Sequence, residues 1–202
     1  MTYSLGEVEA LSRKAARGAG FSWGMAEDAG KAVRWRCNWG LPGAEALAGY
    51  LHARRDAGGP SDTSSAIWSA QSGTLCPITC GTVVSDRGAL DTAVDLHALA
   101  WPLLIVPHVA WIAPKGSVSW PGSQLCWDDH LRLSGPLLTA RADQVTLSTA
   151  SKPDGTACQK IQRADLDDAT LARLTSFAAK TYAPETEASK TTGAGAGLTD
   201  GD

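Results

Sequence analysis

The chain has 202 residues, of which 44% are hydrophobic and 19% are charged, and its formal net charge is -3. An apolar content close to the usual range of about 45–50% excludes intrinsic disorder over most of the length. The near-neutral charge leaves no basic surface of the kind that nucleic-acid-binding proteins carry, so we expect no nucleic-acid partner.

Three observations predict a cytoplasmic protein without a membrane segment. Residues 1–7 have neither the basic start nor the apolar stretch of a secretory signal. The five cysteines are odd in number and widely spread, which is not a disulfide framework. The longest uncharged segment, residues 96–113, contains Pro102 and Pro107, which would interrupt a spanning helix.

Residues 1–56 predict three short helices joined by glycine-containing turns. Ser4 followed by Glu7 matches a capping box at the start of the first helix. Apolar residues then recur at helical spacing, and residues 40–43 (GLPG) end the second helix. A last helix is predicted over residues 165–182, because acidic residues open it and Pro184 follows it.

Residues 63–163 predict mainly strands, because the segment is rich in Ser, Thr and Gly and short apolar runs alternate with polar residues. The strands are predicted at residues 67–68, 75–84, 101–113, 118–120, 131–133, 137–141, 145–148 and 157–163, with one short helix at residues 88–96. Their close spacing leaves no room for helical crossovers, which favours antiparallel pairing.

Together these segments predict one α+β domain over residues 1–182, with helices on one face of a mainly antiparallel sheet. Residues 183–202 form a Gly- and Ala-rich tail that has little apolar surface to bury. We expect the tail to be mobile or docked on a partner, and a second copy of the chain is one candidate partner.

The densest polar cluster is Asp128, Asp129 and His130. Two carboxylates beside an imidazole are candidate catalytic groups, because they supply an acid and a base. The competing interpretation, which we favour, is a turn between strands in which Asp accepts backbone hydrogen bonds.

Cys76 is a candidate catalytic nucleophile, and the favoured alternative is a buried structural thiol. It is separated from Cys80 by three residues, but a second ligand pair with similar spacing is absent, so we expect no metal. The glycine-rich run at residues 193–197 follows a helix and a loop and does not open a helix, so we expect no nucleotide cofactor.

Tryptophan accounts for 8 residues, against 3 Tyr and 2 Phe. Trp35 lies between two arginines, and Arg34 beside it would suit an anion or a carboxylate. Trp127 also has charged neighbours. His108 lies in an apolar run, where it is either a hydrogen-bonded core residue or a base at the floor of a pocket. These four residues are the candidate ligand-binding set.

The two ends of the chain resemble a bacterial family of about 200 residues that is catalogued as a domain of unknown function, number 3726. The resemblance rests on YSL (residues 3–5), AARGAG (15–20), AGKAVRW (29–35), GLPG (40–43) and TYAPETEAS (181–189). It implies a bacterial, cytoplasmic protein and assigns no activity to any residue.

Two classes of function remain open. The favoured one is a cytoplasmic bacterial accessory or small-molecule-binding protein of catabolism, which predicts an aromatic pocket without converging titratable groups. The alternative is a small hydrolase or lyase, which predicts that Asp128, Asp129, His130 or Cys76 meet in one cleft. An interaction subunit that uses its tail is compatible with the first class.

Overall fold

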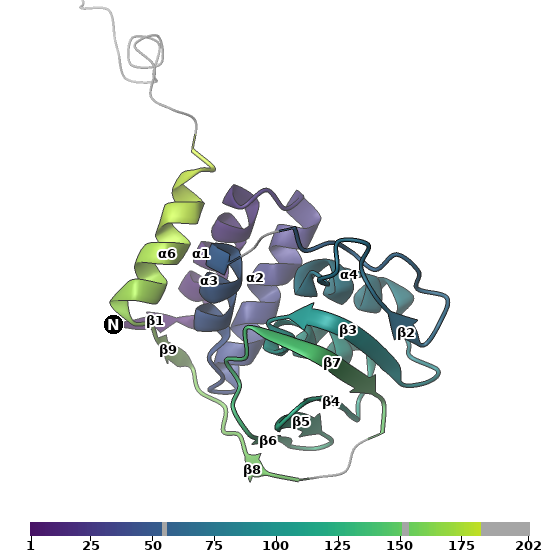
Figure 1. The fold of residues 1–202 in the computed structure, drawn as a ribbon. Helices are drawn as coiled ribbons and strands as arrows, with labels where there is room; N and C mark the ends of the chain where they lie inside the picture. The colour runs from purple at the N-terminus through teal and green to yellow at the C-terminus, as the bar shows by residue number, and fades with distance from the viewer. Residues whose placement is uncertain (54–55, 151–153, 183–202) are drawn as a thin grey trace, which may run out of the picture.

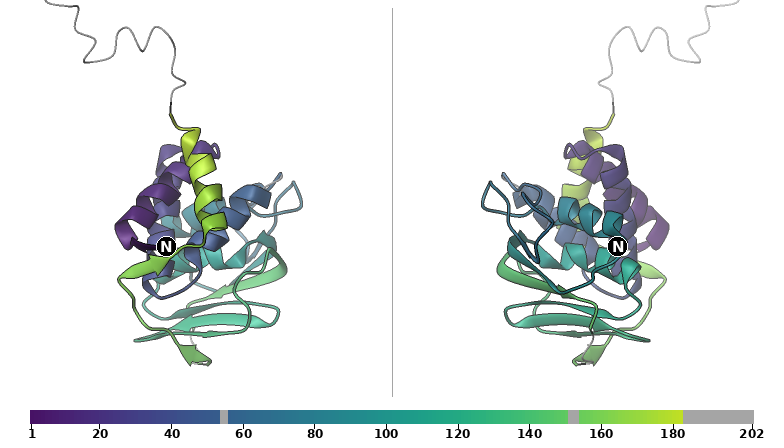
Figure 2. Two further views of the ribbon diagram at one scale, coloured as in Figure 1. Left: turned by 90° about the vertical axis from the view of Figure 1, so that its left-hand side faces the viewer. Right: turned by 90° about the vertical axis from the view of Figure 1, so that its right-hand side faces the viewer.

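A computed structural model describes residues 1–53, 56–150 and 154–182. It confirms the α+β class, with helices gathered on one side and strands β4 to β6 and β8 at the opposite end (Figures 1 and 2). The predicted tail, residues 183–202, lies outside the described residues.

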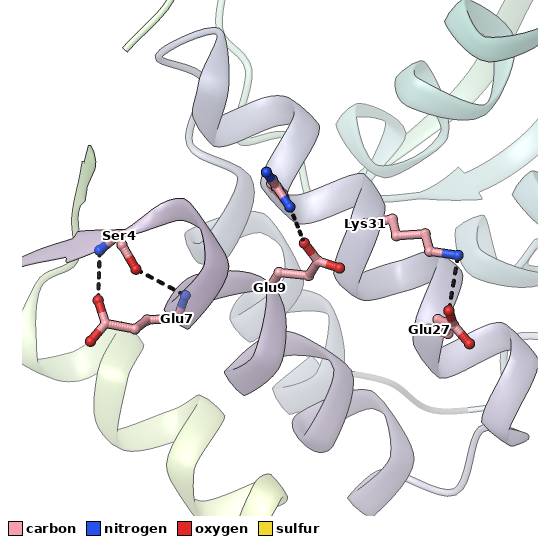
Figure 3. Close-up of polar contacts among 6 residues, drawn as sticks. Ser4, Glu7, Glu9, Glu27 and Lys31 are labelled. Carbon is pink, nitrogen blue, oxygen red and sulfur yellow. Dashed lines mark hydrogen bonds and ion pairs between the residues drawn. The ribbon is translucent and has the colours of Figure 1, made fainter. Parts of the chain in front are cut away.

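The helices predicted at both ends of the chain are present and pack together. They are α1 (Leu5–Gly18), α2 (Trp23–Asn38), α3 (Gly43–Ala53) and α6 (Asp168–Ala179). The capping box at the start of α1 is confirmed: the Glu7 N–H donates to Ser4 Oγ over 3.2 Å, and the Ser4 N–H donates to the Glu7 carboxylate over 2.7 Å (Figure 3). Helix α6 begins three residues later than predicted, because the side chain of Asp167 caps it.

Seven strands form the large sheet in the order β2-β3-β7-β4-β5-β6-β8. Their bounds are β2 (Ile67–Trp68), β3 (Val94–Ala100), β4 (Gly116–Trp120), β5 (Ser123–Trp127), β6 (Leu131–Ser134), β7 (Arg141–Ser148) and β8 (Thr156–Ala157). Strands β2 and β3 are parallel, and the other pairings described in this sheet are antiparallel, as predicted. Val145 and Leu147 of β7 are buried on the core face.

A second, two-stranded sheet joins the ends of the described chain. Strand β1 (Thr2–Ser4) pairs antiparallel with β9 (Arg163–Asp165). The amino group of Met1 donates a further hydrogen bond to the Leu166 carbonyl over 3.0 Å. Because β1 leads directly into α1 and β9 precedes α6, this sheet places those two helices side by side (Figure 1).

The strand predicted at residues 75–84 is wrong, because the segment forms helix α4 (Pro77–Arg87). Its Ser, Thr and Val content favours strand, but its first residues carry a helix start: Cys76 accepts from the Thr79 N–H, and Pro77 occupies the first turn. Proline suits that position, since its missing N–H has no partner there in any case.

The strands predicted at residues 101–113 are also wrong: the segment forms a 3-10 helix, η1 (Pro102–Ile105), and helix α5 (Val106–Ile112). A short buried apolar run does not distinguish strand from helix by its period. The prolines that excluded a spanning helix instead stand in the first turns of these two helices. The segment 63–163 is therefore less uniformly made of strands than predicted.

Smaller errors follow in the same region. The helix predicted at residues 88–96 is wrong: residues 88–93 form a loop, and residues 94–96 begin β3. Residues 137–140 precede β7 without joining it. Only the two ends of the predicted strand 157–163 are strand, as the last residue of β8 and the first of β9. Strand β5 was not predicted, and it pairs with β4 through a turn at Pro121 and Gly122, where φ is +79°.

The helices approach one another closely at small residues. A Cβ at Gly30 of α2 would lie 2.9 Å from the Glu9 carbonyl oxygen of α1. A Cβ at Gly18 of α1 would lie within van der Waals overlap of the Phe177 carbonyl of α6. These glycines therefore fix how deeply α1 is seated between α2 and α6.

Substitution of Gly18 tests this close packing. We expect Gly18→Ala to lower the free energy of unfolding by about 1–2 kcal/mol, because overpacking against backbone outweighs the higher helix propensity of Ala. Urea denaturation followed by circular dichroism measures it. The matched control is Gly6→Ala in the same helix, where an added Cβ meets nothing within 4 Å and stability should be unchanged or slightly higher. Equal effects at both positions would contradict the packing argument.

Candidate ligand-binding groove

An open groove of about 700 Å³ runs along α2 on the side that faces α1. Its wall is made by residues of both helices, by Trp111 near the end of α5, and by the segment before β9. The lining residues are Leu5, Glu9, Lys31, Arg34, Trp35, Asn38, Trp111, Lys160 and Gln162. The volume lies within the range of about 300–1,000 Å³ that small-molecule sites occupy.

The side chain of Arg34 is held at the groove by a carboxylate from the neighbouring helix. Arg34 Nη1 lies 2.9 Å from Glu9 Oε2, and 57% of the Arg34 side chain is exposed, against 23% for Glu9 (Figure 3). An exposed pair of this kind adds about 0–1 kcal/mol to stability. Its main consequence is therefore positional, since it orients a guanidinium that remains accessible.

A second ion pair lies one turn earlier on α2. Lys31 Nζ lies 3.0 Å from Glu27 Oε1, four residues apart on the helix (Figure 3). The hydrogen bond to Glu27 raises the pKa of Lys31, and the reciprocal contact lowers the pKa of Glu27. Lys31 therefore carries its charge at the groove across the physiological pH range.

Trp35 contributes an aromatic ring to the wall and lies close to the ring of Trp39, the residue that follows α2. The rings of Trp35 and Trp39 lie 6.3 Å apart at an angle of 57°. Lys160 Nζ lies 4.8 Å from the centre of the Trp39 ring, on its face. A cation over an indole is attracted to it electrostatically, so this contact helps to hold Lys160 against the end of α2.

Trp111 reaches the groove from α5 and is 41% exposed. Its ring meets the ring of His108 edge to face, with centroids 4.9 Å apart. His108 is buried and its Nδ1 lies 2.9 Å from Ser85 Oγ. The exposed tryptophan is thus supported from behind by a fixed imidazole.

The segment at residues 160–162 is attached to the end of α2 by a reciprocal pair of hydrogen bonds. Asn38 Nδ2 donates to the Ile161 carbonyl over 2.8 Å, and the Ile161 N–H donates to the Asn38 carbonyl over 2.8 Å. The two wall residues on either side of Ile161, Lys160 and Gln162, are therefore held against the helix rather than carried by a free loop.

Of the predicted ligand-binding candidates, Arg34 and Trp35 line this groove. Trp127 is buried, and its indole N–H donates to the Ala113 carbonyl over 3.0 Å. His108 is a hydrogen-bonded core residue that contacts the groove through Trp111. Burial, with a smaller contribution from the nearby charge of Arg36, lowers the pKa of His108 to about 3, so the ring is neutral at neutral pH.

Arg36, the second of the two arginines that flank Trp35, faces the interior. It is 1% exposed, and its Nη1 donates to the Leu104 carbonyl over 2.9 Å. Its Nε has no hydrogen-bond partner, and within the described residues no carboxylate lies within ion-pair distance. Burial lowers the pKa of Arg36 to about 9.

The predicted catalytic cluster at residues 128–130 occupies the turn between β5 and β6. Asp128 accepts a hydrogen bond from the His130 N–H over 3.1 Å, and this bond is the main cause of its lowered pKa. Asp129 and His130 are exposed. Asp128 thus behaves as a turn residue that stabilises the hairpin.

Cys76 is buried at the start of α4, on a different element from the hairpin turn. The hydroxyl of Tyr50 donates to its Sγ over 2.9 Å, and the Thr79 N–H donates over 3.4 Å. The structure does not bring Cys76 together with Asp128, Asp129 or His130. Among the described residues, no three His, Cys, Asp or Glu side chains gather closely enough to hold a metal ion.

Sequence reasoning missed the groove residues Lys31, Lys160 and Trp111. Trp111 was expected in a buried strand, and only the helical form of residues 106–112 turns it outward. Lys160 is distant in sequence from α2, so no local pattern could place it there. The sequence does contain one signal of the groove: Arg34 stands next to Trp35 on a predicted helix.

The fold and the groove define an α+β protein with an open, aromatic and basic groove at the junction of its first two helices. Residues 3–76 match the model of a family described as "Protein of unknown function (DUF3726)", which confirms the family resemblance seen at the N-terminal residues. Comparison with curated proteins and with solved structures finds no match. Among the described residues, none of the helices has both the length and the apolar character that crossing a membrane requires.

Proposed function

We propose that the protein binds a small molecule in the groove between α1 and α2, as a cytoplasmic bacterial accessory protein of catabolism. One observation carries this proposal: a groove of about 700 Å³ combines two accessible tryptophans with three cationic side chains on a wall fixed by hydrogen bonds and ion pairs. Ligand sites typically combine an apolar lining with a few oriented polar groups. The five cysteines, all unpaired, are consistent with a reducing compartment.

A hydrolase or lyase has less support. It requires a nucleophile and an acid or base in one cleft, and the candidates for these roles lie on a hairpin turn and on a buried helix cap. We therefore infer that the groove binds its ligand without transforming it.

A thermal-shift screen of small carboxylates, amino acids and metal ions tests the proposal. A ligand that binds the folded state raises the melting temperature by mass action. We expect the shift to be lost in Trp111→Ala and kept in Trp23→Ala. The second variant is the matched control, because Trp23 is 66% exposed and contacts Arg17 outside the groove. A shift that survives Trp111→Ala would place the ligand elsewhere, and no shift from any compound would count against a small-molecule site.

A further inference from the structure

We propose that the ligand of this groove is a planar organic anion with a single carboxylate. This inference rests on the proposed binding function and names its ligand class. The carboxylate would meet Arg34, and the flat apolar body would lie against Trp35 and Trp111. Three properties of the groove support this ligand class: its net charge, the free hydrogen-bond donors of Arg34, and the flat indole rings of Trp35 and Trp111.

The charge of the groove favours one negative charge. The lining contains three cations, Lys31, Arg34 and Lys160. Glu9 pairs with Arg34, and Glu27 pairs with Lys31. The groove and its ion-pair partners therefore carry three positive and two negative charges, a net charge of +1. A monoanion neutralises this charge, whereas a phosphate dianion would leave a net charge of -1.

The hydrogen-bonding capacity also favours a carboxylate. A guanidinium has five N–H donors in a planar fork that matches a carboxylate. Arg34 contacts Glu9 through Nη1. The other N–H donors of this exposed guanidinium therefore remain available to a ligand. Glu9 holds the fork in place, so a ligand loses less side-chain entropy in binding it.

Three of the eight tryptophans, Trp68, Trp120 and Trp127, donate their indole N–H to Ser65, Thr139 and Ala113. Within the described residues, the indole N–H of each of the other five tryptophans has no protein acceptor, and two of these five, Trp35 and Trp111, line the groove. These two residues therefore offer both an apolar face and a free donor, which suits a flat ligand that carries acceptor oxygens.

Isothermal titration calorimetry with matched probes tests the ligand class. The probes are benzoate and 2-naphthoate, their neutral carboxamides, acetate as a carboxylate without a ring, and phenyl phosphate as a dianion. We expect 2-naphthoate to bind the full-length protein at least about tenfold more tightly than its carboxamide, acetate or phenyl phosphate. Arg34→Gln should weaken the carboxylates about tenfold and leave the carboxamides unchanged, whereas Trp111→Ala should weaken both.

The matched control is Arg141→Gln, because the Arg141 side chain is 54% exposed in its ion pair, against 57% for Arg34, and it lies outside the groove. Carboxamides that bind as tightly as the carboxylates, with the same loss in Trp111→Ala, would overturn the anion assignment and leave the binding function standing. Binding of phenyl phosphate more tightly than 2-naphthoate would overturn the assignment of a single negative charge to the ligand. If none of the aromatic probes binds, the planar-anion class is overturned, and the thermal-shift screen decides separately whether the groove binds a small molecule.

Discussion

Acidification from pH 6.5 to about pH 4 is expected to lower the free energy of unfolding by about 3 kcal/mol through His108 alone. In the folded protein, burial holds the pKa of His108 at about 3, below its ordinary value of 6.5. Between these two values the unfolded chain binds a proton at this ring and the folded chain does not. The neutral ring thus contributes stability that is fully present above pH 6.5 and is lost as the pH falls towards 3.

Urea unfolding at several pH values, compared between the protein and His108→Gln, isolates this contribution from the carboxylates. The substitution itself lowers stability at pH 7, but the pH dependence between 6.5 and 4 should become shallower by up to about 1.4 kcal/mol per pH unit. The control is His130→Gln, because His130 is exposed on the turn between β5 and β6 and should keep the full slope. Parallel curves for the protein and His108→Gln would show that the imidazole titrates normally.

Replacement of Arg36 by Met is expected to raise the free energy of unfolding at pH 7 by about 2–3 kcal/mol. The lowered pKa of about 9 means that the folded interior disfavours the charged guanidinium, which has one carbonyl partner and an unpartnered Nε. Met is an unbranched, flexible side chain that fills much of the same space without a charge, and replacement of buried ion pairs by apolar residues is often neutral or stabilising by about 1–4 kcal/mol. The Leu104 carbonyl loses its donor, which offsets part of the gain.

Chemical denaturation measures this difference, and Arg141→Met is the control. Arg141 is exposed and makes a long ion pair of 3.6 Å with Asp143, so its replacement should change stability by less than about 0.5 kcal/mol. A loss of stability of 2 kcal/mol or more in Arg36→Met would mean that the guanidinium makes stronger interactions than its contact with Leu104.

The elements that could be predicted are those whose signals are local. Helix α1 follows from a capping box and a helical period, and β7 follows from the alternation at residues 145–148. The composition of residues 75–84 and 101–113 favours strand, whereas the position of the prolines favours the helices α4 and α5 that form there. Pro77 and Pro107 each stand in a first helical turn, which is a start signal rather than a breaker.

The groove could be anticipated only in part. Arg34 and Trp35 are adjacent on a helix, so their combination of charge and ring is visible in the sequence. Lys160 and Trp111 reach the groove only through tertiary packing, and for these residues no local pattern exists. Conversely, the residue types at 128–130 suggest acid–base catalysis, but in the structure they form a turn between two strands. A short hairpin needs polar side chains that accept hydrogen bonds from its backbone N–H groups, and Asp128 does so.

The pairing of β1 with β9 has a consequence for how the protein is made. The segment that matches the family model, residues 3–76, includes α1 but not α6, which packs directly on it. On the ribosome, where domains generally form as units, the first helices must wait for the last described helix to be synthesised before their exposed face is covered. Such distant contacts slow folding, because a long loop has to close before they form. A fragment that ends at residue 76 would accordingly leave the α6-facing side of α1 exposed to solvent, so we expect it to be less stable than the same region in the full chain.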